Sequence, residues 1–133
     1  MSGITTGYDI VTWDMETNEY TLLVNEPYDQ GLPDADGHIV TYLDSQAAGG
    51  GWFGSYHSEV KIIDRDTLEK RVVLPLDTYY GLGIWDHYLA VNNVGMWGDS
   101  IVVCDLEIMD LVDSEGHVIP EGSGADAGAD GGK

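Results

Sequence analysis

Short runs of apolar and β-branched residues, separated by polar turns, occupy most of the chain. Two of these runs, Asp9 to Asp14 and Glu59 to Asp64, end in an aspartate and are each followed by a polar turn. A second run then returns, from Glu19 to Val24 in the first case and from Glu69 to Leu74 in the second. This arrangement predicts two β-hairpins.

Further strands are expected between and after these hairpins. His38 to Asp44 and Tyr88 to Asn92 have strand composition, and small-residue stretches through Gly31 and Gly81 are typical of tightly packed inner strands. No segment has a long 3.6-residue period. Asp105 to Val112 is either a short helix-like stretch or a last strand. The chain is therefore expected to be all-β.

Proline and glycine mark the expected breaks between strands. Pro27 and Pro75 follow the return strands and should interrupt strand pairing there, because proline has no N–H to donate. The run from Pro33 to Gly37 predicts a turn. We expect Asp77, Tyr79 and Tyr80 to lie in a loop between an outer strand and the next inner strand.

The chain repeats itself at an offset of 50 residues, from about residue 10 to residue 40. The identical pairs are Asp14 with Asp64, Thr17 with Thr67, Glu19 with Glu69, Gly31 with Gly81, Leu32 with Leu82, and Asp36 with Asp86. A shorter third copy places Ile101 to Asp105 on Val60 to Asp64, now at an offset of 41. A period of 40–50 residues is typical of propeller blades.

Four neighbouring strands in each repeat predict β-propeller blades of four antiparallel strands. The chain holds about 2.5 such blades, at approximately residues 8–28, 29–76 and 77–119, which together form a repeat region over residues 1–119. The remaining residues, 120–133, are acidic and rich in glycine and alanine, and we expect them to be disordered.

The repeat resembles the blade of TolB-type and related WD-like six-bladed propellers over about residues 8–105. The matching residues of the first copy are Asp14, Thr17, Glu19, Asn25, Pro27, Pro33, Gly37, Ile39 and Val40. The second copy departs from this pattern, with Pro75-Leu76-Asp77 in place of Asn25-Glu26-Pro27 and Gly83 in place of Pro33. The resemblance implies a fold and no particular ligand, and no residues specific to TolB partners are recognisable.

A closed propeller ring needs 4–8 blades, so about 2.5 blades would leave apolar blade faces and a sheet edge uncovered. One interpretation is that the chain forms a homo-oligomer, with two copies supplying about five blades. The other is that the sequence is a fragment of a longer propeller. We favour self-association. The function predicted for the assembled chain is that of a non-enzymatic binding or scaffolding module.

Aromatic and acidic residues gather in the loops that share one face of a propeller. The candidate ligand-binding residues are Tyr28, Asp29, Trp52, Phe53, Tyr56, His57, Asp77, Tyr79, Tyr80 and Trp97. Aromatic faces stack on sugar rings or on cationic side chains, and nearby carboxylates assist both. The expected ligand is a basic protein or peptide, or a glycan in a lectin-like alternative that relies on Trp52, Trp97 and Tyr79. The rings could instead fill gaps between blades or line a subunit contact.

The net charge of −19 narrows the range of partners. Such a surface repels phosphate backbones, so no nucleic-acid partner is expected, and the longest apolar run is too short for membrane insertion. The acidity indicates either a solvated surface or a site for a cationic partner. The single cysteine, Cys104, excludes an intramolecular disulfide and is expected to be buried. The sequence does not indicate the cellular compartment of the protein.

No motif indicates a cofactor or a metal site. Asp34, Asp36 and Gly37 have part of the spacing of a calcium loop, but an ordinary Asp-Gly turn is the better interpretation. The strand-ending aspartates Asp14, Asp64 and Asp105 are expected to accept backbone N–H bonds from the turns that follow.

The histidines and the carboxylates do not point to a catalytic centre. His38, His57, His87 and His117 have no ligand spacing and are interpreted as exposed turn residues. No nucleophile elbow, P-loop or zinc-protease motif is present. A hydrolase that uses a carboxylate pair remains an alternative, because 24 acidic residues offer many chance pairs.

Overall fold

The computed structural model describes residues 9–24, 30–45, 57–94 and 99–121. These residues form eight β-strands and contain no α-helix. The strands are β1 (Ile10–Asp14), β2 (Glu19–Val24), β3 (Gln30–Asp36), β4 (Ile39–Asp44), β5 (His57–Asp64), β6 (Lys70–Trp85), β7 (Tyr88–Asn93) and β8 (Ser100–Asp105). The prediction of an all-β chain is confirmed.

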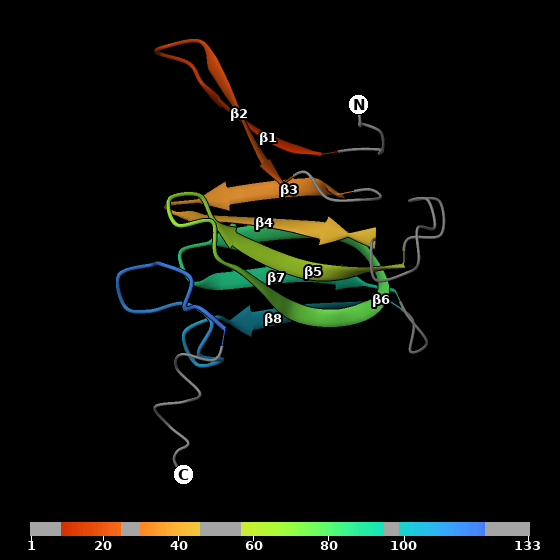
Figure 1. Ribbon diagram of the computed structural model, residues 1–133. Helices are drawn as coiled ribbons and strands as arrows, with labels where there is room; N and C mark the ends of the chain where they lie inside the picture. The colour runs from red at the N-terminus through yellow and green to blue at the C-terminus, as the bar shows by residue number, and fades with distance from the viewer. Residues whose placement is uncertain (1–8, 25–29, 46–56, 95–98, 122–133) are drawn as a thin grey trace.

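The strands form a two-stranded hairpin and a six-stranded antiparallel sheet (Figure 1). The sheet has the order β3-β4-β5-β6-β7-β8 and curls into a half-barrel. The first part of β6 pairs with β5 and the second part pairs with β7, so β6 turns the corner of the half-barrel. The β1–β2 hairpin lies beyond β3 and projects away from the sheet.

The long strand β6 corrects the expectation of a loop at Asp77, Tyr79 and Tyr80, because all three residues lie within it. Pro75 also lies inside β6 and does not end the strand, although the register with β5 skips from Leu74 to Asp77 at this proline. The register with β5 shifts between Ser58 and Val60, opposite this proline. A bulge lets a strand pass a residue that has no N–H to donate, so the ladder resumes at Asp77. The expected blade boundary between residues 76 and 77 thus falls inside one continuous strand.

Two further local predictions were wrong. The stretch from Pro33 to Asp36 belongs to β3, and the turn contains only Gly37 and His38. A register shift between Gly31 and Asp34 accommodates Pro33 without ending the strand. The stretch after Asp105 is neither a helix nor a strand, because residues 106–110 form turns.

The three strand-ending aspartates make the same turn, as predicted. In each case Oδ1 accepts the backbone N–H groups of the residues two and three positions later: Glu16 and Thr17 for Asp14, Asp66 and Thr67 for Asp64, and Glu107 and Ile108 for Asp105. This is the Asx-turn geometry that aspartate favours. The β1–β2 and β5–β6 ladders also share a register shift at the same repeat position, between Ile10 and Val11 and between Val60 and Lys61.

The buried side chains form two clusters on opposite faces of β4 and β5. The larger cluster joins one face of these strands to β7 and β8, and its members include Ile39, Leu43, Val60, Ile62, Leu89, Val91 and Cys104. The smaller cluster joins the other face to the hairpin through Ile10, Val24, Val40, Tyr42 and Ile63. The prediction that Cys104 is buried is confirmed.

Candidate functional site

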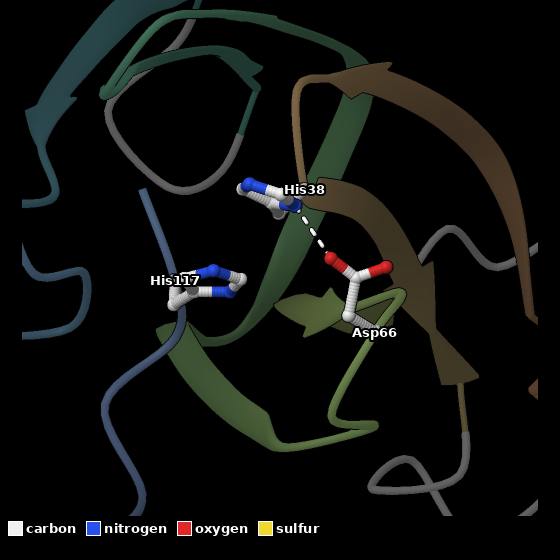
Figure 2. A group of neighbouring side chains, drawn as sticks. All are labelled: His38, Asp66 and His117. Atoms are coloured by element: carbon white, nitrogen blue, oxygen red, sulfur yellow. Dashed lines mark ion pairs between the residues drawn. The ribbon is translucent and has the colours of Figure 1, made fainter. Parts of the chain in front are cut away.

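Three turns that are distant in sequence bring two histidines and a carboxylate together (Figure 2). His38 belongs to the turn between β3 and β4, Asp66 to the turn after β5, and His117 to a loop closed by a bridge between Val112 and Val118. The two imidazole rings stack with centroids 4.0 Å apart, and His38 Nδ1 lies 2.6 Å from Asp66 Oδ2. One donor atom of each residue lies within 4.8 Å of those of the other two.

A buried carboxylate, Asp64, holds His117 in this position. Its Oδ2 lies 2.8 Å from His117 Nδ1 and accepts the backbone N–H of Val118 at 3.0 Å. Burial alone would raise the pKa of Asp64, but the hydrogen bonds that it accepts outweigh burial and lower that pKa. The hydrogen bond to Asp64 raises the pKa of His117 in turn.

The interpretation of the histidines as exposed turn residues was right about the turns for His38 and His87, but it was wrong about exposure for the three histidines whose side chains are described. His38, His87 and His117 are half-buried, and each lies close to a carboxylate. Sequence spacing gave no signal, because residues 38, 66 and 117 meet only through the curl of the sheet and the return of the chain after β8. Motifs that place metal ligands at a fixed spacing in the sequence, such as two ligands on one helix, cannot reveal a site assembled from distant segments.

A cleft of about 210 Å³ lies next to this group and is lined by His38, His87 and several carboxylates. Its acidic residues are Asp36, Asp86, Glu107 and Glu115. His87 Nδ1 lies 3.2 Å from Asp86 Oδ2, and its Nε2 lies 3.7 Å from Asp105 Oδ1. The cleft thus concentrates negative charge at the turn end of the sheet, where a cationic group would be favoured.

Most of the predicted ligand-binding residues lie outside the described part of the chain. These are Tyr28, Asp29, Trp52, Phe53, Tyr56 and Trp97. His57 is described only through its backbone, which pairs with Thr78. The acidic tail beyond residue 121 also lies outside the described residues.

The three remaining predicted residues, Asp77, Tyr79 and Tyr80, all lie on β6 but have different environments. Tyr79 is 3% exposed, and its hydroxyl donates to the carbonyl of Pro75. Its ring is part of the core, so the lectin-like alternative loses one of its three stacking rings. Tyr80 is exposed, whereas Asp77 is half-buried and its Oδ1 accepts the N–H of Thr78.

Exposed apolar side chains that the sequence did not single out form one face of the hairpin. We call Val11, Trp13, Tyr20 and Leu22 the hairpin face, and each is 50–69% exposed. The β1–β2 register pairs Val11 with Leu22 and Trp13 with Tyr20, so all four point to the same side. The Trp13 and Tyr20 rings stack with centroids 5.8 Å apart.

A second exposed apolar face lies at the other end of the sheet. We call Trp85, Tyr88, Ile101 and Val103 the β8 face, and these residues are 38–72% exposed. The register pairs Trp85 with Tyr88, and Ile101 and Val103 alternate with the half-buried Val102 and the buried Cys104. The rings of Trp85 and Tyr88 stack with centroids 5.9 Å apart. Each exposed face therefore carries one stacked Trp–Tyr pair.

Comparison with protein-family models, with curated proteins and with solved structures finds no match. The resemblance to TolB-type propellers therefore stays a prediction. In the described part of the chain, no helix is long and apolar enough to cross a membrane.

Proposed function

We propose that this chain is a non-enzymatic, self-assembling scaffold in which the hairpin face of one copy packs on the β8 face of the next. Successive units of the array are the hairpin, the β3–β5 strands with the first part of β6, and the rest of β6 with β7 and β8. Head-to-tail stacking of copies would continue this array and close a propeller-type ring.

The observation that carries this proposal is the correspondence between the exposed faces and the buried ones. Trp13 occupies the repeat position of Ile63, which is 1% exposed because the hairpin covers it. In the last unit Val103 occupies the position of Ile62, which is 0% exposed against β7 and β8. These two positions are thus buried in the unit that has a neighbour on the corresponding side. A second copy supplies the missing neighbour for both faces.

Apolar faces with stacked aromatic pairs are unusual on an isolated soluble chain. Aromatic residues are enriched at the centres of protein interfaces, and charged residues are depleted there. Both faces have this composition, although the net charge of the whole chain is −19. Copies repel one another at long range, so the assembly should tighten when salt screens that repulsion.

Substitution of each face tests the proposal. Trp13→Lys alters the hairpin face and Val103→Lys alters the β8 face. Ile108→Lys is the matched control, because it makes the same change of charge at a side chain that is 80% exposed and outside both faces. Trp13→Lys and Val103→Lys should each raise the dissociation constant of the oligomer at least about tenfold, and the control should leave it unchanged.

A mixing experiment tests the head-to-tail geometry. Trp13→Lys chains keep an intact β8 face, and Val103→Lys chains keep an intact hairpin face. The two variants should each be monomeric alone and should form a heterodimer when mixed, because one complete interface is then available. Self-association of either variant alone, at the strength of the original chain, would contradict the head-to-tail arrangement.

The assembled scaffold would present its acidic surface to a partner. A basic protein or peptide is the partner that this charge favours, and the acidic cleft beside His38 and His87 offers one contact point. The glycan-binding and hydrolase alternatives stay predictions. Binding of a Lys/Arg-rich peptide that weakens with salt supports the basic-partner proposal, and binding of a neutral saccharide in its place would overturn it.

A further inference from the structure

We propose that His38, Asp66 and His117 form a binding site for a divalent transition-metal ion of the zinc class. The three side chains come from three separate turns and converge at one point (Figure 2). Donor atoms within 4.8 Å of one another need only small side-chain rotations to share an ion, since metal–ligand bonds are about 2.0–2.2 Å long. The site lies on neither exposed apolar face, so it is independent of the proposed assembly.

The contact between His38 and Asp66 also has a geometry that suits a shared ion. His38 Nδ1 is shielded from solvent, and no hydrogen bond with acceptable angles reaches it from the described residues. It nevertheless lies 2.6 Å from Asp66 Oδ2. Buried polar atoms are nearly always paired, and coordination to an ion is one established reason for an exception. A nitrogen and a carboxylate oxygen that are close but not aligned with each other suit a shared cation.

The second histidine is already oriented as metal-binding histidines are. Asp64 Oδ2 lies 2.8 Å from His117 Nδ1 and is fully buried, so it favours the tautomer in which Nδ1 carries the proton. That tautomer leaves the lone pair of Nε2 free for an ion. A carboxylate that fixes the outer nitrogen of a histidine is a regular companion of histidine–metal bonds and increases the affinity for the metal.

The donor set selects the class of ion. Two imidazole nitrogens and one carboxylate oxygen suit Zn²⁺, Co²⁺, Ni²⁺ or Cu²⁺, whereas Ca²⁺ and Mg²⁺ prefer oxygen ligands alone. Three protein ligands leave one tetrahedral position for water. The ion would link the segment that carries His117 to the turns after β3 and β5. Hydrogen bonds to the sheet already hold that segment: His117 Nδ1 and Val118 N–H bond to Asp64, and Arg71 donates to the carbonyl of Ile119.

Titration of the tag-free, EDTA-treated protein with Zn²⁺ alone tests the proposal, with calorimetry and the thermal unfolding midpoint as readouts. His38→Gln and Asp66→Asn each remove one ligand from a half-exposed or exposed turn position. His87→Gln is the matched control, because His87 occupies the same place in the turn between β6 and β7 and lines the same cleft. Far-UV circular dichroism verifies the fold of each variant.

The original chain and His87→Gln should bind one Zn²⁺ per chain and unfold at a higher temperature when it is bound. His38→Gln and Asp66→Asn should each lose at least about tenfold in affinity. Co²⁺ should give visible ligand-field absorption in the original chain that is absent from both ligand variants. Absence of Zn²⁺ binding, equal binding by His38→Gln, or an equal loss in His87→Gln would each overturn the proposal.

Discussion

The backbone N–H of Ile84 donates a hydrogen bond of 2.9 Å to Asp34 Oδ2, across 50 positions of sequence. Fifty residues is also the offset at which the sequence repeats, so this bond joins one copy of the repeat to the next. The next pair does the same, because Asp86 N–H donates to Asp36 Oδ2 at 2.6 Å. Two side chains of β3 thus bond to backbone N–H groups at the end of β6 and in the turn that follows it.

Replacement of Asp34 should loosen this junction. Asp34→Ala removes the acceptor and should lower the free energy of unfolding by about 1 kcal/mol. Asp34→Asn removes the same charge but keeps a side-chain oxygen that can accept the N–H of Ile84. This variant should therefore lose less of the free energy of unfolding. Urea denaturation of the two variants measures the difference. Equal losses would mean that charge, and not the hydrogen bond, is what matters at this position.

The three Asx turns offer a matched set for a second prediction. Asn can replace Asp in the turn itself, because its Oδ1 still accepts the following N–H groups. At Asp64, however, the amide nitrogen of Asn would meet the N–H of Val118, and two donors would then face each other. Asp64→Asn should therefore cost about 2 kcal/mol or more of unfolding free energy.

The exposed turn at Asp14 supplies the control for this prediction. Asp14→Asn should change the free energy of unfolding by no more than about 0.5 kcal/mol, because Asp14 is exposed and its acceptor in the turn is kept. Both variants lose one negative charge, so the difference between them isolates the hydrogen bonds of Asp64. Similar midpoints in urea for the two variants would contradict a special role for Asp64.

Alkaline conditions should destabilise the fold through Tyr79. Burial, followed by the nearby charge of Asp77, raises the pKa of Tyr79 to about 12 from an ordinary value of 10.0. Because the folded-state pKa is the higher one, the stabilisation is complete below about pH 10 and is lost as the pH rises through about 12. Tyr79→Phe should be less stable than the original chain at pH 8, by about 1 kcal/mol, because it loses the bond to Pro75.

The gap between Tyr79→Phe and the original chain should narrow as the pH rises from about 10 toward 12. Urea midpoints measured at several pH values test this, and the difference between the two proteins removes the contribution of the other tyrosines. A gap that is constant with pH would show that the hydroxyl of Tyr79 titrates freely in the folded state.

The turn between β6 and β7 contains a residue in a conformation that favours glycine. Asp86 has φ of 57°, and Gly37 has φ of 61° at the same position of the β3–β4 turn. Asp86→Gly should be more stable than Asp86→Ala by about 1 kcal/mol, because alanine is strained at positive φ. Both variants remove the same charge and the same contact with His87. Thermal unfolding measures the difference, and equal midpoints would contradict this explanation.

The sequence predicted the hairpins and the Asx turns because these depend on neighbouring residues. The alternation of apolar and polar residues, followed by a turn, is enough to predict the β1–β2 and β5–β6 hairpins. Asp14 and Asp105 need only the next three residues to make the hydrogen bonds of their turns. The loop expected after Pro75 is absent, because a register shift between Ser58 and Val60 lets β6 continue past this proline. Bulges depend on the partner strand and are therefore hidden in a single run of residues.

The candidate sites were harder to predict for the same reason. His38 and His117 meet because the sheet curls and the chain returns to β5 after β8, and neither event has a local signal. The hairpin face was also missed, because Trp13 and Tyr20 look like core residues of ordinary strands, and only the structure shows that the described residues leave them exposed. Exposure of an apolar face depends on which other elements pack on it and not on the strand alone.

The mass of the unmodified, tag-free chain in solution tests the central claim of self-assembly most directly. Light scattering during size-exclusion chromatography should be run at about 0.05 M and about 1 M NaCl. We predict one discrete oligomer, with a dimer of about twice the 14.5 kDa chain mass as the smallest form, and a lower dissociation constant at high salt. A well-folded monomer at both salt concentrations and at high protein concentration would contradict the account.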